Sequence, residues 1–243
     1  ISLEANPETV TFDKICGYRD VGFNRISLGM QSASRFDLKM LDREHHNESL
    51  LNAVEWCRKA GLKHTNLDLM FGIPGQSLES WMRTLKLALG LGVDHFSLYS
   101  LILEEGTRLK RWSDRGIIVE QDEDLAADMY EAAMVELESA GYGQYEISNW
   151  ALGEEARCRH KLQYWRYLPY LGFGAGAHGF YGHTRVENLS TIDAYVDTVR
   201  RYGSIIFPAG PACLAVNHLS RWEMMQEHLM VAMRLTDEGV SLA

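Results

Sequence analysis

The sequence Asn66-Leu67-Asp68-Leu69-Met70-Phe71-Gly72-Ile73-Pro74 combines a short apolar strand with a tight turn. Ser77 then begins an amphipathic helix, which Gly92 ends. The same order of strand, loop and helix occurs on both sides of this stretch at intervals of roughly 30–35 residues, which predicts parallel βαβ units. Periodicity alone leaves two α/β architectures open, a doubly wound sheet and part of a barrel.

The predicted elements divide the chain into a regular and a less regular part. In the regular part we expect strands at 1–3, 25–31, 65–71 and 95–103, and helices at 11–21, 47–60 and 77–91. The remainder shows a helix at 122–140, a strand at 144–148, an irregular stretch over 151–190, and helices near 191–202 and 219–235. We therefore expect one domain at 1–150 and an α+β C-terminal region at 151–243.

The composition argues against several classes of protein. Of the 243 residues, 46% are hydrophobic and 23% are charged, which is ordinary for a globular chain. The formal net charge of −9 argues against nucleic acid or an anionic membrane as the main partner, because both need a basic face. No apolar run reaches the ~18 residues of a membrane span, while peripheral contact with a membrane stays open. The first residues lack the segments of a signal peptide, so we expect a cytoplasmic protein. The sequence starts without Met inside a predicted strand and stops without a closing element, so we expect both ends to be truncated.

The four cysteines do not form a recognisable motif. Cys16, Cys57, Cys158 and Cys213 are far apart and fit neither a zinc knuckle nor a redox CxxC. Cys16 and Cys57 fall on the apolar faces of predicted helices, so we expect buried free thiols there.

Polar residues stand where the predicted strands end, and this is where parallel α/β folds bind ligands. Glu4 follows the first strand, Gln31 closes the second, and Asp68 lies within the third among apolar neighbours, where a carboxylate is costly without a partner. With Arg43 at the same rim, Glu4 would take an ammonium group and Arg43 a carboxylate, while Gln31 and Asp68 would hold a ribose diol. In the structural alternative, Asp68 caps a loop amide and Glu4 pairs with an arginine.

Three further patterns carry little weight. The stretch Gly174-Ala175-Gly176-Ala177-His178-Gly179 matches GxGxxG, but neither a clear helix nor an acidic residue follows at the required place. The histidine pairs His45-His46 and His178/His183 lack the third ligand that a metal site needs.

Several motifs in order resemble the radical SAM proteins related to oxygen-independent coproporphyrinogen III oxidase. They are Leu3-Glu4-Ala5-Asn6-Pro7, Arg25-Ile26-Ser27-Leu28-Gly29-Met30-Gln31-Ser32, the 66–74 stretch and Tyr145-Glu146-Ile147-Ser148-Asn149. The segment from Cys158 to Trp165 and the segment from Tyr170 to His178 favour the HemW-type haem-chaperone branch. The resemblance covers nearly the whole chain.

The resemblance implies a partial parallel (βα)6 barrel, of which this chain holds the last four units. It also implies a [4Fe-4S] cluster held by a CxxxCxxC loop upstream of Ile1, so that no cluster ligand lies in this chain. The cluster binds S-adenosylmethionine (SAM) and cleaves it to a 5′-deoxyadenosyl radical. By motif match, Glu4, Gln31, Arg43 and Asp68 correspond to SAM contacts, with Ile102 a backbone or apolar neighbour.

A second ligand site is implied by the segment Cys158-Arg159-His160-Lys161-Leu162-Gln163-Tyr164-Trp165, which matches the segment linked with haem binding. His160 would be the axial ligand, and Tyr164 and Trp165 would stack on the macrocycle. Lys161 stands where that motif usually has Asn, which either adds a partner for a haem propionate or weakens the site. In the structural alternative, the segment only fixes its loop to the barrel.

Three functions follow from these features. The first is a SAM- and cluster-binding haem chaperone that passes haem to acceptor proteins of unknown identity. The second is a coproporphyrinogen III oxidase, an oxidoreductase that decarboxylates propionates, and the third is a non-catalytic ligand-binding domain. No catalytic residue is assigned, and we expect this stretch to be inactive by itself.

Overall fold

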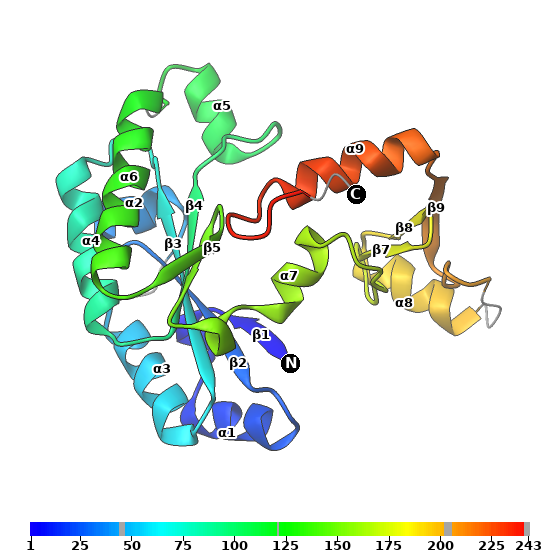
Figure 1. The fold of residues 1–243 in the computed structure, drawn as a ribbon, viewed down its shortest axis with the longest axis horizontal. Helices are drawn as coiled ribbons and strands as arrows, with labels where there is room; N and C mark the ends of the chain where they lie inside the picture. Colours follow the sequence, from blue (N-terminus) through cyan, green and yellow to red (C-terminus); the bar gives the residue numbers. More distant parts are fainter. Residues whose placement is uncertain (44–46, 121, 202–205, 241–243) are drawn as a thin grey trace. The chain divides into compact units, whose positions relative to one another are not determined.

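The computed structural model describes residues 1–43, 47–120, 122–201 and 206–240. The chain divides into two compact units, unit 1 at Ile1–Arg157 and unit 2 at Cys158–Ala243. Figure 1 labels their elements along the chain. The His45-His46 pair lies outside the described residues.

Unit 1 is built on a six-stranded sheet in the order β1-β2-β3-β4-β6-β5. Its parallel strands are β1 (Ser2–Ala5), β2 (Arg25–Gln31), β3 (His64–Phe71) and β4 (His95–Ser100). The antiparallel strands β6 (Asn149–Ala151) and β5 (Gly143–Glu146) complete it. The prediction of an α/β fold with a parallel sheet is confirmed, and among the described residues the sheet does not close into a barrel.

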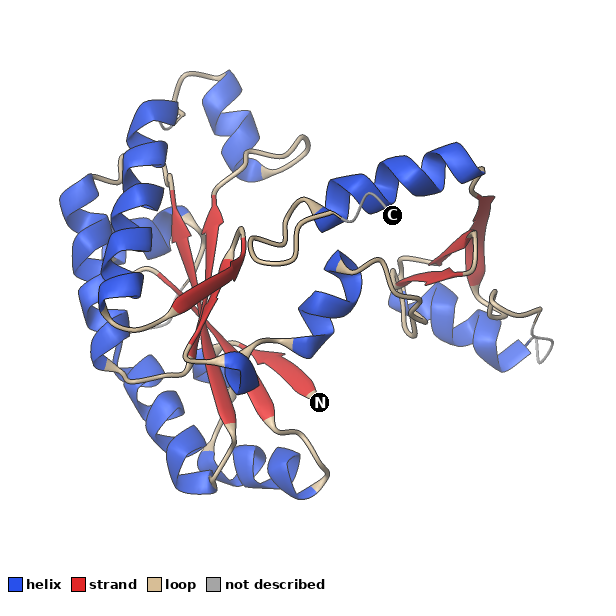
Figure 2. Cartoon of the chain, in the orientation of Figure 1, coloured by secondary structure: helices blue, strands red, loops and turns tan. Residues whose placement is uncertain are grey.

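Helices cover one face of this sheet (Figure 2). The long ones are α1 (Phe12–Asp20), α3 (Asn47–Ala60), α4 (Leu78–Gly90) and α6 (Glu123–Ser139). The short ones are η1 (Pro7–Thr9), α2 (Arg35–Met40), α5 (Arg108–Asp114) and η2 (Glu154–Ala156). The side chains of Thr11, Ser77 and Asp122 cap the N-termini of α1, α4 and α6 by accepting backbone N–H bonds, which fixes where these helices begin.

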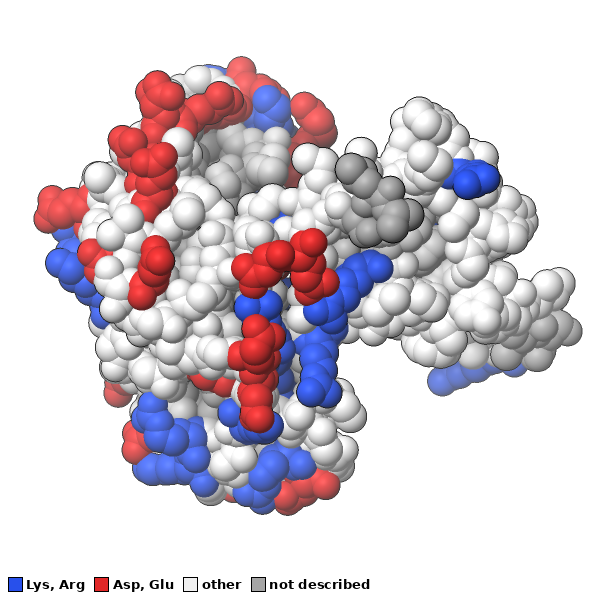
Figure 3. Space-filling model, viewed as in Figure 1, with Lys and Arg blue, Asp and Glu red and all other residues white. Residues whose placement is uncertain are grey.

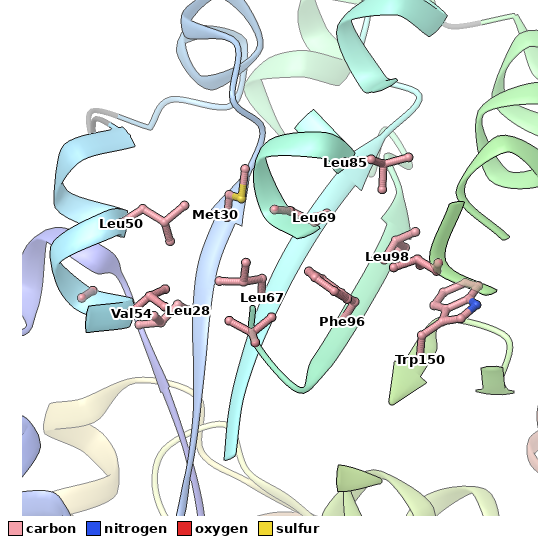
Figure 4. Packing of buried hydrophobic residues seen from close by; sticks show 14 of the residues in the cluster. Leu28, Met30, Leu50, Val54, Leu67, Leu69, Leu85, Phe96, Leu98 and Trp150 are labelled. Carbon is pink, nitrogen blue, oxygen red and sulfur yellow. The ribbon is translucent and has the colours of Figure 1, made fainter. Parts of the chain in front are cut away.

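The core lies between the helices and the sheet. One row of paired strand residues, Leu28, Leu67, Phe96 and Trp150, is at most 1% exposed. Figure 4 shows this row under side chains of α3 and α4. Because side chains alternate along a strand, the residues between these core positions point to the opposite face, which no long helix of unit 1 covers.

That opposite face is polar. Ser27, Asn66 and His95 form one row across β2, β3 and β4, and Gly29, Asp68, Ser97 and Asn149 form the next row. A sheet with one apolar and one polar face supports a core on one side and a ligand site on the other.

Unit 2 contains an antiparallel sheet and helices. Its strands are β7 (His178–Tyr181), β8 (Thr184–Asn188) and β9 (Cys213–His218), and its helices are α7 (Arg159–Trp165), α8 (Ile192–Arg201) and α9 (Arg221–Ala232). The prediction of an irregular stretch over 151–190 is therefore wrong, because α7, β7 and β8 lie in it. These elements are short, and their polar residues hide the alternation that identifies longer strands.

Several other local predictions differ from the structure. The strand predicted at 144–148 is a hairpin of β5 and β6, whose register shifts between Gln144 and Glu146. The β4 strand ends at Ser100 instead of 103. Cys57 is buried as predicted, whereas Cys16 is only half-buried. Among the described residues, Cys16, Cys57, Cys158 and Cys213 form no disulfide.

The surface carries both signs of charge. On the face in Figure 3, acidic side chains gather over α6, and basic ones gather toward the end of unit 1 that holds α1 and α3. Within the part of the chain that the structure describes, no helix is both long enough and apolar enough to cross a membrane.

Candidate functional site

Asp68 is held on the polar face of the unit 1 sheet by two neighbouring side chains. The Ser27 hydroxyl donates to Asp68 Oδ2 at 2.6 Å, and Asn66 Nδ2 donates to Asp68 Oδ1 at 2.9 Å. Asn66 Nδ2 also lies 2.5 Å from Ser27 Oγ. These partners are side chains of the sheet face and not loop amides, so each carboxylate oxygen accepts one bond and keeps room for a second.

Glu4 lies on β1, in register with Ser27 of β2 and therefore in the same row as Asn66. Its side chain is exposed, and it forms no ion pair with the residues that the structure describes. An exposed carboxylate at this edge of the polar face is able to receive a cationic group.

Gln31 closes β2 in an unusual backbone conformation. Its φ is 60°, in the left-handed region, and the pairing of β2 with β3 shifts register between Gly29 and Gln31. The side chain is nearly buried and folds back over Gly29, where a Cβ would lie 3.0 Å from Gln31 Nε2 and 3.8 Å from Asn6 Oδ1. Gly29 therefore keeps open a small polar cradle that a side chain would fill.

Arg43 reaches the same cradle from the segment after α2. Its Nη1 donates to Asn6 Oδ1 at 2.6 Å, and its backbone N–H donates to Leu38 O at 2.8 Å. Asn6 thereby joins Arg43 to the Gly29 and Gln31 end of the sheet. Sequence reasoning assigned no role to Asn6, although its place directly after β1 is the signal that could have found it.

Ile102 lies apart from these groups. It follows β4, is 77% exposed, and lines a cavity of about 360 Å³ together with Gly72, Ser100 and Lys110. None of the other predicted SAM contacts lines this cavity. The described contacts thus bring Asp68 together with Ser27 and Asn66, and Arg43 and Gln31 together with Asn6, while Ile102 stays outside both groups.

In unit 2, His160 and Tyr164 lie one turn apart on α7. Their rings meet edge to face with centroids 4.9 Å apart, and the Tyr164 hydroxyl lies 3.3 Å from His160 Nε2. Tyr164 also packs edge to face on Tyr170, at 4.6 Å. Burial raises the pKa of the Tyr164 phenol, and the nearby Tyr170 adds to the shift. His160 itself is exposed, so an imidazole and a phenol share one accessible patch.

Trp165 lies on a different side of α7. The guanidinium of Arg234 covers its ring at 4.3 Å. Its indole N–H is buried, and among the described atoms it has no hydrogen-bond partner. The structure therefore brings His160 together with Tyr164 and places Trp165 beside Arg234.

Among residues 1–43, 47–120, 122–201 and 206–240, no three His, Cys, Asp or Glu side chains are close enough to hold a metal ion. The four cysteines are also scattered over both units. The described residues therefore do not fit an iron–sulfur cluster.

Comparison with known proteins places the chain in a family. Residues 1–88 match the model of the radical SAM superfamily. The haem chaperone HemW of Bacillus subtilis is 35% identical over 99% of this chain and 61% of its own length. The HemW of Escherichia coli is 41% identical over 74% of this chain and 46% of its own length. The chain belongs to the radical SAM superfamily and is a HemW homologue.

The HemW homologue also shares its fold with a solved structure. The radical SAM enzyme coproporphyrinogen III oxidase HemN of Escherichia coli matches 97% of this chain and 55% of its own length, with a TM-score of 0.79 and 21% identity. At that identity the likeness shows the fold alone. The chain spans about half to three fifths of the length of these curated relatives.

Proposed function

We propose that this HemW homologue is a haem chaperone: it binds SAM on the polar face of unit 1, holds haem on α7 of unit 2, and passes the haem to acceptor proteins. The observation that carries the proposal is that a homologue of haem chaperones has two surfaces whose side chains suit ligand binding. One is the polar face of the unit 1 sheet around Asp68, and the other is the patch of His160 and Tyr164 in unit 2.

The SAM site is assigned to side chains at the carboxyl ends of the strands. Glu4 receives the ammonium group, and Arg43 receives the carboxylate through two N–H donors. Asp68 and Gln31 bind the ribose hydroxyls, with Ile102 as an apolar neighbour. The open cradle above Gly29 and the unused acceptor positions of Asp68 support this assignment. Bound SAM, together with a reduced [4Fe-4S] cluster, would supply radical chemistry.

The barrel and the cluster complete this proposal. Unit 1 is assigned to the last four units of a partial (βα)6 barrel, which the parallel strands and the shared fold with HemN support. The cluster is assigned to cysteines outside this chain, because the described residues do not fit it. No step of the proposal is derived through the cluster.

The haem site is assigned to α7. His160 is the proposed axial ligand, and Tyr164 lines one side of the macrocycle. The buried indole N–H of Trp165, beside Arg234, supports a place for a propionate oxygen at the neighbouring side of the helix. Lys161 is adjacent in sequence to the ligand and adds positive charge for the same carboxylates.

Haem titration tests the chaperone. We expect the complete protein to shift the Soret band of haem, and His160→Ala to abolish this shift. The matched control is His183→Ala, at an exposed histidine of the same unit, which should bind haem like the wild type. Equal binding by His160→Ala and the wild type would refute the assigned ligand.

A second candidate function is coproporphyrinogen III oxidase, which the shared fold with HemN favours. In that case the complete protein, given SAM and a reductant, converts coproporphyrinogen, and turnover would contradict the chaperone-only view. A third outcome, SAM or haem binding without turnover or haem transfer, would instead indicate a non-catalytic ligand-binding domain.

A further inference from the structure

A chain of hydrogen bonds connects Asp68 with the interior of unit 1. Asn66 Nδ2 donates to Asp68 at 2.9 Å, Asn66 Oδ1 lies 2.5 Å from His95 Nδ1, and His95 Nε2 lies 2.8 Å from the Tyr145 hydroxyl. Asn66 is 3% exposed, and His95 and Tyr145 are 1% exposed. Ser27 is the second donor to Asp68. This hydrogen-bond chain thus begins at the proposed ligand carboxylate, Asp68, and ends at Tyr145 of strand β5.

The donors and acceptors of this chain are fixed by chemistry. A carboxylate only accepts, so the amide nitrogen of Asn66 faces Asp68 and the amide oxygen faces His95. That oxygen can only accept, so His95 carries its proton on Nδ1. When the imidazole is neutral, its Nε2 then accepts from the Tyr145 hydroxyl. In this tautomer every bond runs in one direction, from Tyr145 toward Asp68.

We propose that Ser27, Asn66 and His95 are positioning residues that hold the Asp68 carboxylate in the rotamer required for a ribose diol. The proposal deepens the SAM site proposed above and rests on it. A carboxylate has about four acceptor positions, and the two donors from the sheet face occupy one on each oxygen. Asp68 is half-exposed, so two vicinal hydroxyls could each reach one oxygen at the remaining positions.

The hydrogen-bond chain can affect Asp68 from a distance because its members are held rigidly in the sheet. Ser27, Asn66 and His95 stand in one row on three hydrogen-bonded parallel strands, so their backbones cannot move independently. Ser97 Oγ also lies 3.1 Å from Asn66 Oδ1, and this second contact resists rotation of the amide. Removing His95 deprives Asn66 Oδ1 of one of its partners. The Asn66 amide then rotates more easily, and its hydrogen bond to Asp68 is held less firmly.

The experiment measures the dissociation constant of S-adenosylhomocysteine, a stable analogue of SAM, for the complete cluster-loaded protein by calorimetry. His95→Leu removes the donor to Asn66 and should weaken binding about fivefold, the value of one hydrogen bond. His95→Asn keeps an N–H close to the position of Nδ1 and should restore affinity to within about twofold of the wild type. Ser27→Ala, which leaves His95 intact, should also weaken binding about fivefold.

Tyr142→Phe is the matched control. Tyr142 is a buried tyrosine close to the same hairpin, and its hydroxyl donates to the backbone oxygen of Val93 instead of to this chain. Its loss should leave the affinity for the analogue unchanged, even if the protein becomes less stable. Equal affinity of His95→Leu, Ser27→Ala and the wild type would overturn the positioning role.

A second measurement does not depend on ligand binding. Long-range ¹⁵N–¹H correlation spectra of the wild type, assigned with His95→Asn, should show His95 as the neutral Nδ1–H tautomer. The Nε2–H tautomer would overturn the proposal even if the variants fail to fold. Asp68→Ala separates the two levels of inference: unchanged affinity in Asp68→Ala refutes the SAM site, whereas loss there with normal affinity in His95→Leu refutes only the positioning chain.

Discussion

Gln31 combines a strained backbone conformation with a proposed role in ligand binding. Its φ of 60° belongs to the left-handed region, which residues with a side chain rarely adopt. The strained backbone allows the amide to fold back over Gly29 toward Asn6 and Arg43, as the cradle requires. A β-bulge in the ladder at the same place is the kind of irregularity that re-aims side chains next to binding sites.

Replacing Gln31 with glycine should separate these two effects. Glycine adopts a positive φ without a steric penalty, so Gln31→Gly should keep or raise the free energy of unfolding, by up to about 1 kcal/mol. Without the amide, the affinity for S-adenosylhomocysteine should fall. Urea unfolding and calorimetry on the same samples measure both quantities. A variant that binds the analogue like the wild type would remove Gln31 from the site.

Cys57 offers a prediction about pH at the residue scale. It is fully buried in the core, and burial raises the pKa of its thiol from 9.0 to about 11. Because the folded state then holds the proton more tightly than the unfolded state, the contribution of this thiol is fully present below about pH 9 and is lost as the pH rises toward 11.

The wild type and Cys57→Ala should therefore respond differently to alkali. At neutral pH the variant is less stable because it loses a buried side chain. Between about pH 9 and pH 11 the difference in unfolding free energy should narrow by about 2 kcal/mol, since only the wild type has this thiol to ionise. A difference that stays constant across this range would contradict the assigned pKa.

At the scale of elements, an ion pair joins strand β8 to helix α9 within unit 2. Arg185 donates to both oxygens of Glu227 with distances between 2.6 and 3.0 Å, and Tyr167 donates to the same carboxylate at 2.8 Å. The hydrogen bonds from Arg185 are the main reason that the pKa of Glu227 is lowered. Arg185 also donates to the Tyr170 hydroxyl at 3.2 Å, and its guanidinium lies over the Phe180 ring. The ion pair thus joins α9 to the sheet of unit 2.

The ion pair predicts how acid acts on unit 2. A carboxyl group with a lowered pKa stabilises the folded state above its unfolded pKa, and this stability is lost as the pH falls through the folded pKa. Glu227→Gln should cost about 1–2 kcal/mol at neutral pH and make unfolding less sensitive to acid. The control is Glu79→Gln at the exposed pair with Arg83, where a change under about 0.5 kcal/mol is expected. An equal effect of both variants at neutral pH would contradict the account.

The elements also show what the sequence can and cannot predict. The strands β2 and β3 and the helices α3 and α4 were predictable, because their apolar residues repeat with a clear period and their ends carry capping or turn residues. The helices α2 and α5 escape prediction because each has only six or seven residues, with too few apolar positions to define a face. The β5 and β6 hairpin escapes because its register shift breaks the alternation.

The candidate site follows the same division. Glu4, Gln31 and Asp68 were selected from their places on predicted strands or directly after them, and Arg43 from the segment that follows Gln31. The structure puts all four on or beside the polar face of unit 1. The partners that hold them were not selected. Asn66 is two residues from Asp68 and Ser27 is four residues from Gln31, so alternation would suggest their face. Their contact with Asp68 depends on strand register, which the sequence does not show.

At the scale of the whole molecule, we assign different ligands to the two units. In our proposal, SAM binds at the strand ends of unit 1 and haem binds at α7 of unit 2. The oxidase alternative assigns the porphyrin to the same end of unit 1 as SAM, because there the propionates must meet the reacting group. The place where haem binds therefore distinguishes the chaperone from the oxidase more directly than the affinity for haem does.

Hydrogen–deuterium exchange with mass spectrometry locates both ligand sites. The complete protein is measured with haem and with SAM added separately. We expect haem to slow exchange in peptides covering 158–170, and SAM to slow exchange in peptides covering 4–6, 27–43 and 66–70. His160→Ala should remove the effect of haem and preserve the effect of SAM. Protection by haem at the strand ends of unit 1, with none on α7, would contradict the assignment of this protein as a haem chaperone.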